Sequence, residues 1–214
     1  MNSKLCIICQ NQPISKAYFN CKTCINEDCR VKYAIQVVAK QKEIKANKIK
    51  QDWNKEKIII RQGLKNLTDW QKDLEKPINK ICCLIDKDST CISCKGTTTP
   101  QAGHFHTVKS NGSIRFNLDN LHLQDYNCNC AQSGNIQGYD LGLIDRYGKE
   151  YWEYVKFYLV AKYPLLKMAK HEYQDKIDIA NRIVKWLQLQ NKIYNAKERI
   201  ELREKFNKEI GIYL

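Results

Sequence analysis

Cysteines gathered in two short stretches constrain this chain more than any other feature of its sequence. The chain has 214 residues and 11 cysteines, and several of these are separated by two residues, the spacing of metal ligands. The N-terminal stretch MNSKLCIICQ is too short and too polar for a signal peptide, and no apolar run approaches the roughly 18–20 residues of a membrane span. We therefore expect an intracellular protein without a membrane partner, in which cysteines bind metal rather than form disulfides.

The first stretch contains enough thiols for one zinc ion. Cys6 and Cys9 form a CxxC pair, and the sequence CKTCINEDC supplies three more cysteines. Four thiolates make a closed tetrahedral site, which a segment without a core of its own needs in order to fold. We predict a structural Zn²⁺ bound by Cys6, Cys9, Cys24 and Cys29. One alternative is a second pair formed by Cys21 with Cys24. The other alternative is that these cysteines are free thiols without a metal.

Charge favours a polyanionic partner, nucleic acid before a membrane surface. The chain has 36 Lys+Arg against 23 Asp+Glu, a formal net charge of +13. Residues 30–80 carry 14 Lys or Arg against 6 Asp or Glu, and their apolar residues recur at helical spacing. Thr68 is expected to cap a new helix within this region. Such helices suit binding along phosphates, and a solvated charged face explains them equally well.

The second cysteine-rich stretch has the order of a small fold held together by a metal. Cys91 and Cys94 form a CxxC knuckle, followed by GHFH, a polar turn at Asn111-Gly112 and the alternating run SIRF. The sequence DNLHLQ comes next, and then Cys128 at an expected helix start. Because Asn-Gly between two short extended runs signals a β-hairpin, we predict two strands and a helix, a ββα unit.

The motifs AGH, DN-x-H-x-Q, C-N and SGN resemble those of the HNH, or His-Me finger, nucleases. More closely, the stretch is similar to the NinG (Rap) family of lambdoid phage recombination endonucleases. The similarity is dense from Cys91 to about Gly148 and looser through the N-terminal cysteines and the helix around Trp70. It implies an α+β protein with a zinc finger in residues 1–29, a basic helical region in 30–80, a zinc-stapled ββα-metal nuclease domain in 81–148 and a helical region in 149–214.

The resemblance also implies a ligand set for the second zinc. The family pattern has a second CxxC at this point, and its register places Asp125 at the first cysteine and Cys128 at the second. The implied set is Cys91, Cys94, Asp125 and Cys128, in which one carboxylate replaces a thiolate. In the alternative set, Cys130 takes the place of Asp125. A third alternative is that the zinc is lost and packing replaces it.

Catalytic roles follow by position from the same resemblance. His104 matches the general base, which takes a proton from water, and Asn120 matches a residue that orients that histidine or its loop. Asn129 matches a ligand of a catalytic Mg²⁺ or Mn²⁺. His122 is expected to be a second ligand or a phosphate contact, and Asn135 a further ligand or a helix cap.

One position departs from the commoner HNH pattern. Many of these enzymes have a metal-binding Asp just before the catalytic histidine, whereas this chain has Gly103 there. The NinG-like pattern also has Gly, so another residue must supply the ligand. His122 is the first candidate and His106 the second.

The C-terminal region reads as helical, with Pro164 separating two helices. Ile179, Ile183 and Leu187 form an apolar stripe that suits core packing. The stripe could also pair two subunits, and a homodimer would match the two-fold symmetry of a four-way DNA junction.

The resemblance therefore implies a metal-dependent, structure-selective DNA endonuclease acting on branched recombination intermediates such as Holliday junctions or D-loops. It would be encoded by a phage or prophage and act in the cytoplasm of the bacterial host. One alternative is a zinc-stapled DNA-binding accessory protein of recombination that does not cut. Another is a generic HNH homing or packaging nuclease.

Overall fold

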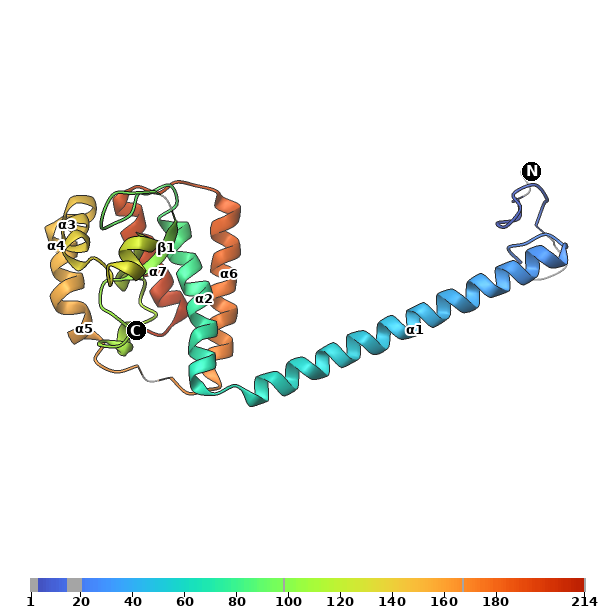
Figure 1. Ribbon diagram of the computed structural model, residues 1–214, viewed down its shortest axis with the longest axis horizontal. Helices are drawn as coiled ribbons and strands as arrows, with labels where there is room; N and C mark the ends of the chain where they lie inside the picture. The colour runs from blue at the N-terminus through green and yellow to red at the C-terminus, as the bar shows by residue number, and fades with distance from the viewer. Residues whose placement is uncertain (1–3, 15–20, 98, 167, 214) are drawn as a thin grey trace. The chain divides into compact units, whose positions relative to one another are not determined.

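The computed structural model describes residues 4–14, 21–97, 99–166 and 168–213, which form two compact units (Figure 1). The first unit is Met1–Leu64 and the second is Lys65–Leu214. Helices and one small two-stranded sheet make this an α+β protein, as predicted. Among the described residues, no helix is both long and apolar enough to cross a membrane.

The first unit consists of a cysteine-rich head and one long helix. Helix α1, Glu27–Leu64, starts where the Asn26 side chain accepts the N–H of Asp28 at 2.8 Å, a typical helix cap. Cys29 is the only buried residue of α1. Most of the basic segment expected within residues 30–80 is therefore a solvent-exposed helix.

Helix α2, Leu67–Ile85, opens the second unit. The Asn66 side chain accepts the N–H of Asp69 at 2.9 Å, and Asp69 accepts the N–H of Asn66 at 3.0 Å. This reciprocal capping box fixes the helix start at Asn66, so the cap predicted at Thr68 is wrong by two residues. The segment boundary expected between residues 80 and 81 falls inside α2.

The sheet contains strands β1, Pro100–His104, and β2, Leu121–Asp125, which pair antiparallel. Gly103 lies opposite His122 in this register. The two strands are joined by residues 105–120 rather than by a tight hairpin.

The hairpin predicted at Asn111-Gly112, with SIRF as its second strand, is therefore wrong. Gly112–Ile114 is a 3₁₀ turn, and a second 3₁₀ turn follows at Leu118–Asn120. The alternating Ile114 and Phe116 are both buried, as in a strand, but they pack into two different clusters. Burial to two sides of an irregular loop thus produced the same pattern as one face of a strand.

After β2 the chain is helical. A π-helical turn at Asn127–Ala131 leads into α3, Ile136–Tyr147. The next run contains α4 (Lys149–Glu153), a π-helical turn (Tyr154–Tyr158) and α5 (Leu159–Lys162). Helices α6, Glu172–Gln190, and α7, Ala196–Ile210, complete the unit. The helix break predicted at Pro164 is confirmed, because it lies between α5 and α6.

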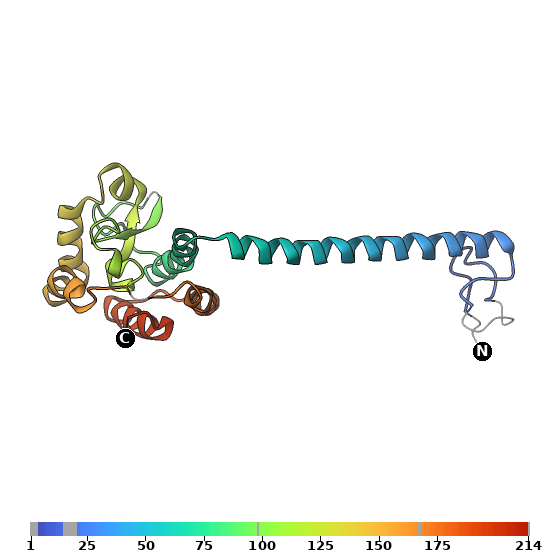
Figure 2. The same ribbon diagram turned by 90° about the horizontal axis from the view of Figure 1, so that it is seen from below.

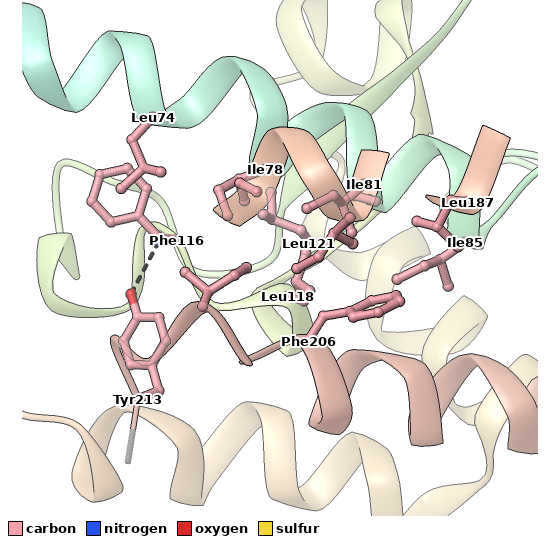
Figure 3. Close-up of a cluster of buried hydrophobic side chains, with 14 of the residues drawn as sticks. Leu74, Ile78, Ile81, Ile85, Phe116, Leu118, Leu121, Leu187, Phe206 and Tyr213 are labelled. Carbon is pink, nitrogen blue, oxygen red and sulfur yellow. Dashed lines mark hydrogen bonds between the residues drawn. The ribbon is translucent and has the colours of Figure 1, made fainter. Parts of the chain in front are cut away.

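Two hydrophobic clusters hold the second unit together. The ribbon shows helices on both sides of the sheet (Figures 1 and 2). The first cluster joins α2, α6 and α7 to the sheet and its preceding loop. Figure 3 shows its members from these elements, among them Leu74, Ile78, Ile81, Phe116, Leu118, Leu121, Leu187 and Phe206. The second cluster joins the Cys91 knuckle to α3, α4 and α5 through Ile92, Phe105, Tyr139, Leu143, Tyr151, Val155 and Leu159. The sheet is therefore fixed from both sides.

Candidate metal and catalytic site

Four cysteines of the head lie close enough to share one metal ion. The sulfur atoms of Cys6, Cys9, Cys24 and Cys29 all lie within 4.8 Å of one another. Burial acts to raise the pKa of Cys6, but backbone N–H groups outweigh it and lower the pKa to about 6. Cys21 instead directs its thiol to the Thr23 carbonyl at 3.2 Å. The four thiols brought together are those selected from the spacing, and they could hold a metal such as zinc.

A second group of thiols lies beside the sheet. The sulfur atoms of Cys91, Cys94 and Cys128 are within 4.8 Å of one another. Each accepts an N–H: Cys91 from Ser93 at 3.4 Å, Cys94 from Gly96 at 3.4 Å, and Cys128 from the Asn135 side chain at 3.5 Å. This group could also hold zinc, because such N–H donors stabilise thiolate ligands.

Neither candidate for a fourth ligand belongs to this group. The Asp125 carboxylate accepts the N–H of Thr99 at 3.3 Å and the N–H of Asn127 at 3.0 Å. Cys130 is exposed, and its sulfur lies 3.8 Å from the side-chain oxygen of Gln101. Among the described residues, neither of these side chains has a ligand atom within 4.8 Å of all three sulfurs.

His104 is the last residue of β1, and its ring is half-buried. Its Nε2 atom lies 3.0 Å from the Arg115 carbonyl oxygen. Burial lowers the pKa of His104, although the hydrogen bond to this carbonyl and the charge of Glu75 act in the opposite direction. The Arg115 side chain is itself held by Gln71 and Glu75 of α2, each at 2.7 Å.

Asn120 fixes the chain that follows His104. Its side-chain oxygen accepts the N–H of His106 at 2.8 Å, and its side-chain nitrogen donates to the His106 carbonyl at 3.0 Å. Its own carbonyl accepts the N–H of Phe105 at 2.9 Å. The His106 ring does not take part in these contacts, because its Nε2 lies 2.8 Å from the Val155 carbonyl oxygen. Asn120 is fully buried, so these hydrogen bonds are shielded from water.

His122 is enclosed in the core. Its Nδ1 lies 3.1 Å from the Tyr139 hydroxyl and its Nε2 lies 3.4 Å from the Tyr151 hydroxyl. It has no exposed surface, and its pKa is held well below the ordinary value, chiefly by burial and then by the charge of Arg203. Both ring nitrogens face tyrosines, which speaks against a role in binding an ion at the surface.

Asn129 and Asn135 both lie near the three thiols. The Asn129 side chain donates to Gln101 at 3.2 Å, and Gln101 lies three residues before His104 and on the other face of β1. Asn135 caps α3 by accepting the N–H of Gly138 at 3.3 Å. Among the described residues, no hydrogen bond joins His104 to Asn129, so the two candidate catalytic groups are not in direct contact.

Gly103 is required by its neighbour. A Cβ at this position would overlap the Gln124 side chain, coming within 2.8 Å of the Gln124 Cβ. Gln124 is buried and donates to the Ser93 hydroxyl at 2.7 Å and to the Gly134 carbonyl at 2.5 Å. The Gln124 side chain therefore occupies the space next to the position at which many HNH enzymes have a metal-binding Asp.

Two features of the candidate site are not predicted by the sequence, the carbonyl of Arg115 and the Gln124 side chain. The sequence predicts Arg115 only as a strand residue, and no residue type signals that a backbone carbonyl will face a histidine. The motif DN-x-H-x-Q contains Gln124 without indicating a role for it. The close approach of Gln124 to Gly103 depends on the strand register, which the sequence did not reveal.

Curated relatives named Protein ninG resemble about half of this chain. The relative from Escherichia phage lambda is 38% identical over 98 residues, 44% of this chain and 48% of its own length. That from Escherichia phage 933W is 37% identical over 99 residues, 45% of this chain and 49% of its own length. That from Salmonella phage P22 is 36% identical over 96 residues, 44% and 47% of the two lengths. The chain thus spans about half the length of the curated relatives it matches.

No solved structure matches the chain. A family model described as Bacteriophage Lambda NinG protein matches residues 1–191, most of the 214-residue chain. By this match, the chain belongs to the NinG family of phage proteins.

Proposed function

We propose that this protein is a structure-selective DNA endonuclease of the HNH class that hydrolyses phosphodiesters in branched recombination intermediates, such as Holliday junctions or D-loops. The observation that carries the proposal is the environment of His104. A backbone carbonyl can only accept a hydrogen bond, so the Nε2 atom facing Arg115 must bear the proton. The Nδ1 atom then keeps its lone pair and is the atom that takes a proton from water.

Two further features support His104 as the base. Its lowered pKa keeps the ring neutral at physiological pH, the form that accepts a proton. The Asn120 side chain holds both the N–H and the carbonyl of His106, two residues after His104. We therefore assign Asn120 the positioning role that the family pattern implies.

The described residues do not offer a preformed site for Mg²⁺ or Mn²⁺. The groups of three or more His, Cys, Asp or Glu side chains found among them are the two thiol clusters. Gly103 has no side chain, and His122 is enclosed. Of the residues expected to bind this ion, Asn129 offers a side-chain oxygen near the sheet, and a catalytic Mg²⁺ or Mn²⁺ is proposed from the resemblance.

Binding to DNA would come mainly from charge. Helix α1 contains ten Lys or Arg and five Asp or Glu, and its side chains are largely exposed. Lysines on an exposed helix contact phosphates without reading bases. The proposed selectivity for branched substrates rests on the family resemblance.

The test is a cleavage assay on a synthetic four-way junction and a matched linear duplex, with Mg²⁺, Mn²⁺ or EDTA. We expect the wild-type protein to cut the junction preferentially and only with a divalent ion. His104→Ala should bind the junction but lose cutting by about 10²–10⁴-fold, the usual contribution of a general base. His171→Ala is the matched control, because His171 is exposed at the start of α6 and should cut normally.

The second candidate function is a zinc-stapled DNA-binding accessory protein of recombination. The burial of His122 and the separation of His104 from Asn129 favour it, because both weaken the case for an assembled metal site. If wild type and His104→Ala bind the junction equally and neither cuts with any ion, this candidate replaces the nuclease. Cutting that depends on DNA sequence rather than branching would instead indicate a generic HNH nuclease.

A further inference from the structure

The cluster of Cys91, Cys94 and Cys128 has three thiols where a structural zinc site normally has four ligands. Structural sites are almost always closed by four protein ligands, whereas sites with three keep a position open for an outside ligand. Which kind of site this is depends on whether any side chain near the cluster can supply the fourth bond.

Cys130 does not face the cluster. It lies two residues after Cys128 on the helical turn Asn127–Ala131, and residues two apart on such a turn point to nearly opposite sides. Cys128 is buried and accepts an N–H from Asn135, whereas Cys130 is exposed and lies 3.8 Å from the Gln101 oxygen. Each of the three clustered sulfurs accepts an N–H, whereas the Cys130 sulfur faces the Gln101 oxygen, which is a hydrogen-bond acceptor.

The Asp125 carboxylate forms hydrogen bonds to the backbone near the sheet instead of joining the thiols. One of its oxygens accepts the N–H of Thr99 just before β1, and the other accepts the N–H of Asn127 at the start of the helical turn. The carboxylate therefore joins the two chain segments that flank the sheet. None of its oxygens lies within 4.8 Å of all three sulfurs, whereas zinc ligands must share a centre about 2.0–2.3 Å from each atom.

No further His, Cys, Asp or Glu side chain of the described residues joins the three thiols. The residues outside the described part of the chain are 1–3, 15–20, 98, 167 and 214, and none of these is a Cys, His, Asp or Glu. All side chains of those four types therefore lie in the described part of the chain, where the group contains three thiols only.

We propose that Cys91, Cys94 and Cys128 bind one zinc ion through three thiolates and leave its fourth position to an exchangeable ligand from solvent. In the free protein this ligand is water or hydroxide, and small neutral nitrogen donors can replace it. Cys94 is exposed, so outside ligands reach the metal from its side. The head, with four thiolates, is the closed site of the same chain and serves as an internal reference.

The test uses the full-length chain and Co²⁺, whose visible absorption reports its ligands. Cys6→Ser/Cys9→Ser limits Co²⁺ to the cluster near the sheet, and Cys91→Ser/Cys94→Ser limits it to the head. We expect imidazole to shift the cobalt bands of the first variant and to leave those of the second unchanged. Adding Asp125→Asn or Cys130→Ser to the first variant should not change its bands, and thiolate-to-cobalt charge transfer should keep its intensity.

Three results would overturn the proposal. If the cobalt bands do not shift with imidazole but change with Asp125→Asn, Asp125 is the fourth ligand. A loss of charge-transfer intensity with Cys130→Ser would assign the position to Cys130. Absence of Co²⁺ from Cys6→Ser/Cys9→Ser, while Cys91→Ser/Cys94→Ser binds one equivalent, would exclude a metal beside the sheet. The imidazole titration remains decisive if Asp125→Asn fails to fold, and none of these readouts depends on DNA cleavage.

Discussion

Single residues in this protein acquire their roles from burial as much as from chemical type. His104 and His122 are both histidines of the central motif, but one is half-buried against a carbonyl and the other is sealed between two tyrosines. Position 103 has no room for a side chain, because the Gln124 side chain occupies the adjacent space. The roles of His122 and Gly103 can be examined separately by stability measurements.

His122 makes folding sensitive to mild acid. Its pKa in the folded protein is held well below the ordinary value, mainly by burial, so the folded chain stays unprotonated while the unfolded chain takes up a proton below about pH 6.5. Stability is therefore intact above that pH and falls as the pH drops, by about 1.4 kcal/mol per unit for one such histidine. Urea unfolding between pH 8 and 5 measures the slope.

His122→Gln should lose this part of the acid slope, even though it is less stable at pH 8. His171→Gln, a change at an exposed histidine, should keep it. An unchanged slope in His122→Gln would mean that His122 titrates normally in the folded protein. That outcome would reopen its assignment as a metal ligand.

Gly103→Ala should destabilise the sheet by about 1–3 kcal/mol, the usual cost of an overpacked side chain. The added Cβ would collide with Gln124, so Gly103→Ala/Gln124→Ala should be more stable than the two single effects predict. Gly112→Ala is the matched control, because nothing lies within 4 Å of a Cβ at Gly112. Additive effects at Gly103 and Gln124 in thermal unfolding would contradict this close approach.

At the scale of elements, sequence patterns worked best where the physics is local. The four thiols of the head followed from the spacing of its cysteines, and the break at Pro164 followed from a missing backbone donor. The register of the family resemblance placed Cys128 with Cys91 and Cys94. The prediction of a hairpin at Asn111-Gly112 is wrong because Ile114 and Phe116 are buried in different clusters. An alternating sequence pattern does not show into which cluster each side chain packs. The positions of Asp125 and Gln124 could not be predicted, since each depends on the register between β1 and β2.

Helix α1 should be dispensable for folding but not for binding DNA. The second unit has both hydrophobic clusters of the sheet, so a protein of residues 65–214 should unfold at nearly the same temperature as that unit in the full chain. Without the ten basic residues of α1, its affinity for the junction should fall, and the affinity should depend less steeply on salt. Fluorescence anisotropy from 50 to 200 mM salt measures both quantities. An unchanged salt slope would show that α1 makes no phosphate contacts.

At the scale of the whole molecule, the end of the chain completes the core of the second unit. The family match ends at residue 191, yet α7 lies beyond it and packs Phe206 and Ile210 into the main cluster. Arg203 of α7 is fully buried and lies 2.8 Å from both carboxylate oxygens of Asp86, at the end of α2. The pKa of Asp86 is about 2, because the charge of Arg203 overcomes the effect of burial.

Arg203→Met should therefore destabilise the protein by about 3–5 kcal/mol, because it leaves the Asp86 charge buried without its partner. Adding Asp86→Asn should recover part of the loss, since the remaining group is then neutral and can still accept the N–H of Leu123. Lys197→Met, at an exposed position of the same helix, should change stability by less than about 0.5 kcal/mol. Urea midpoints at pH 7 compare the four proteins. If the double variant is less stable than Arg203→Met, the pair is not what joins α7 to α2, and apolar packing around Phe206 must account for the attachment.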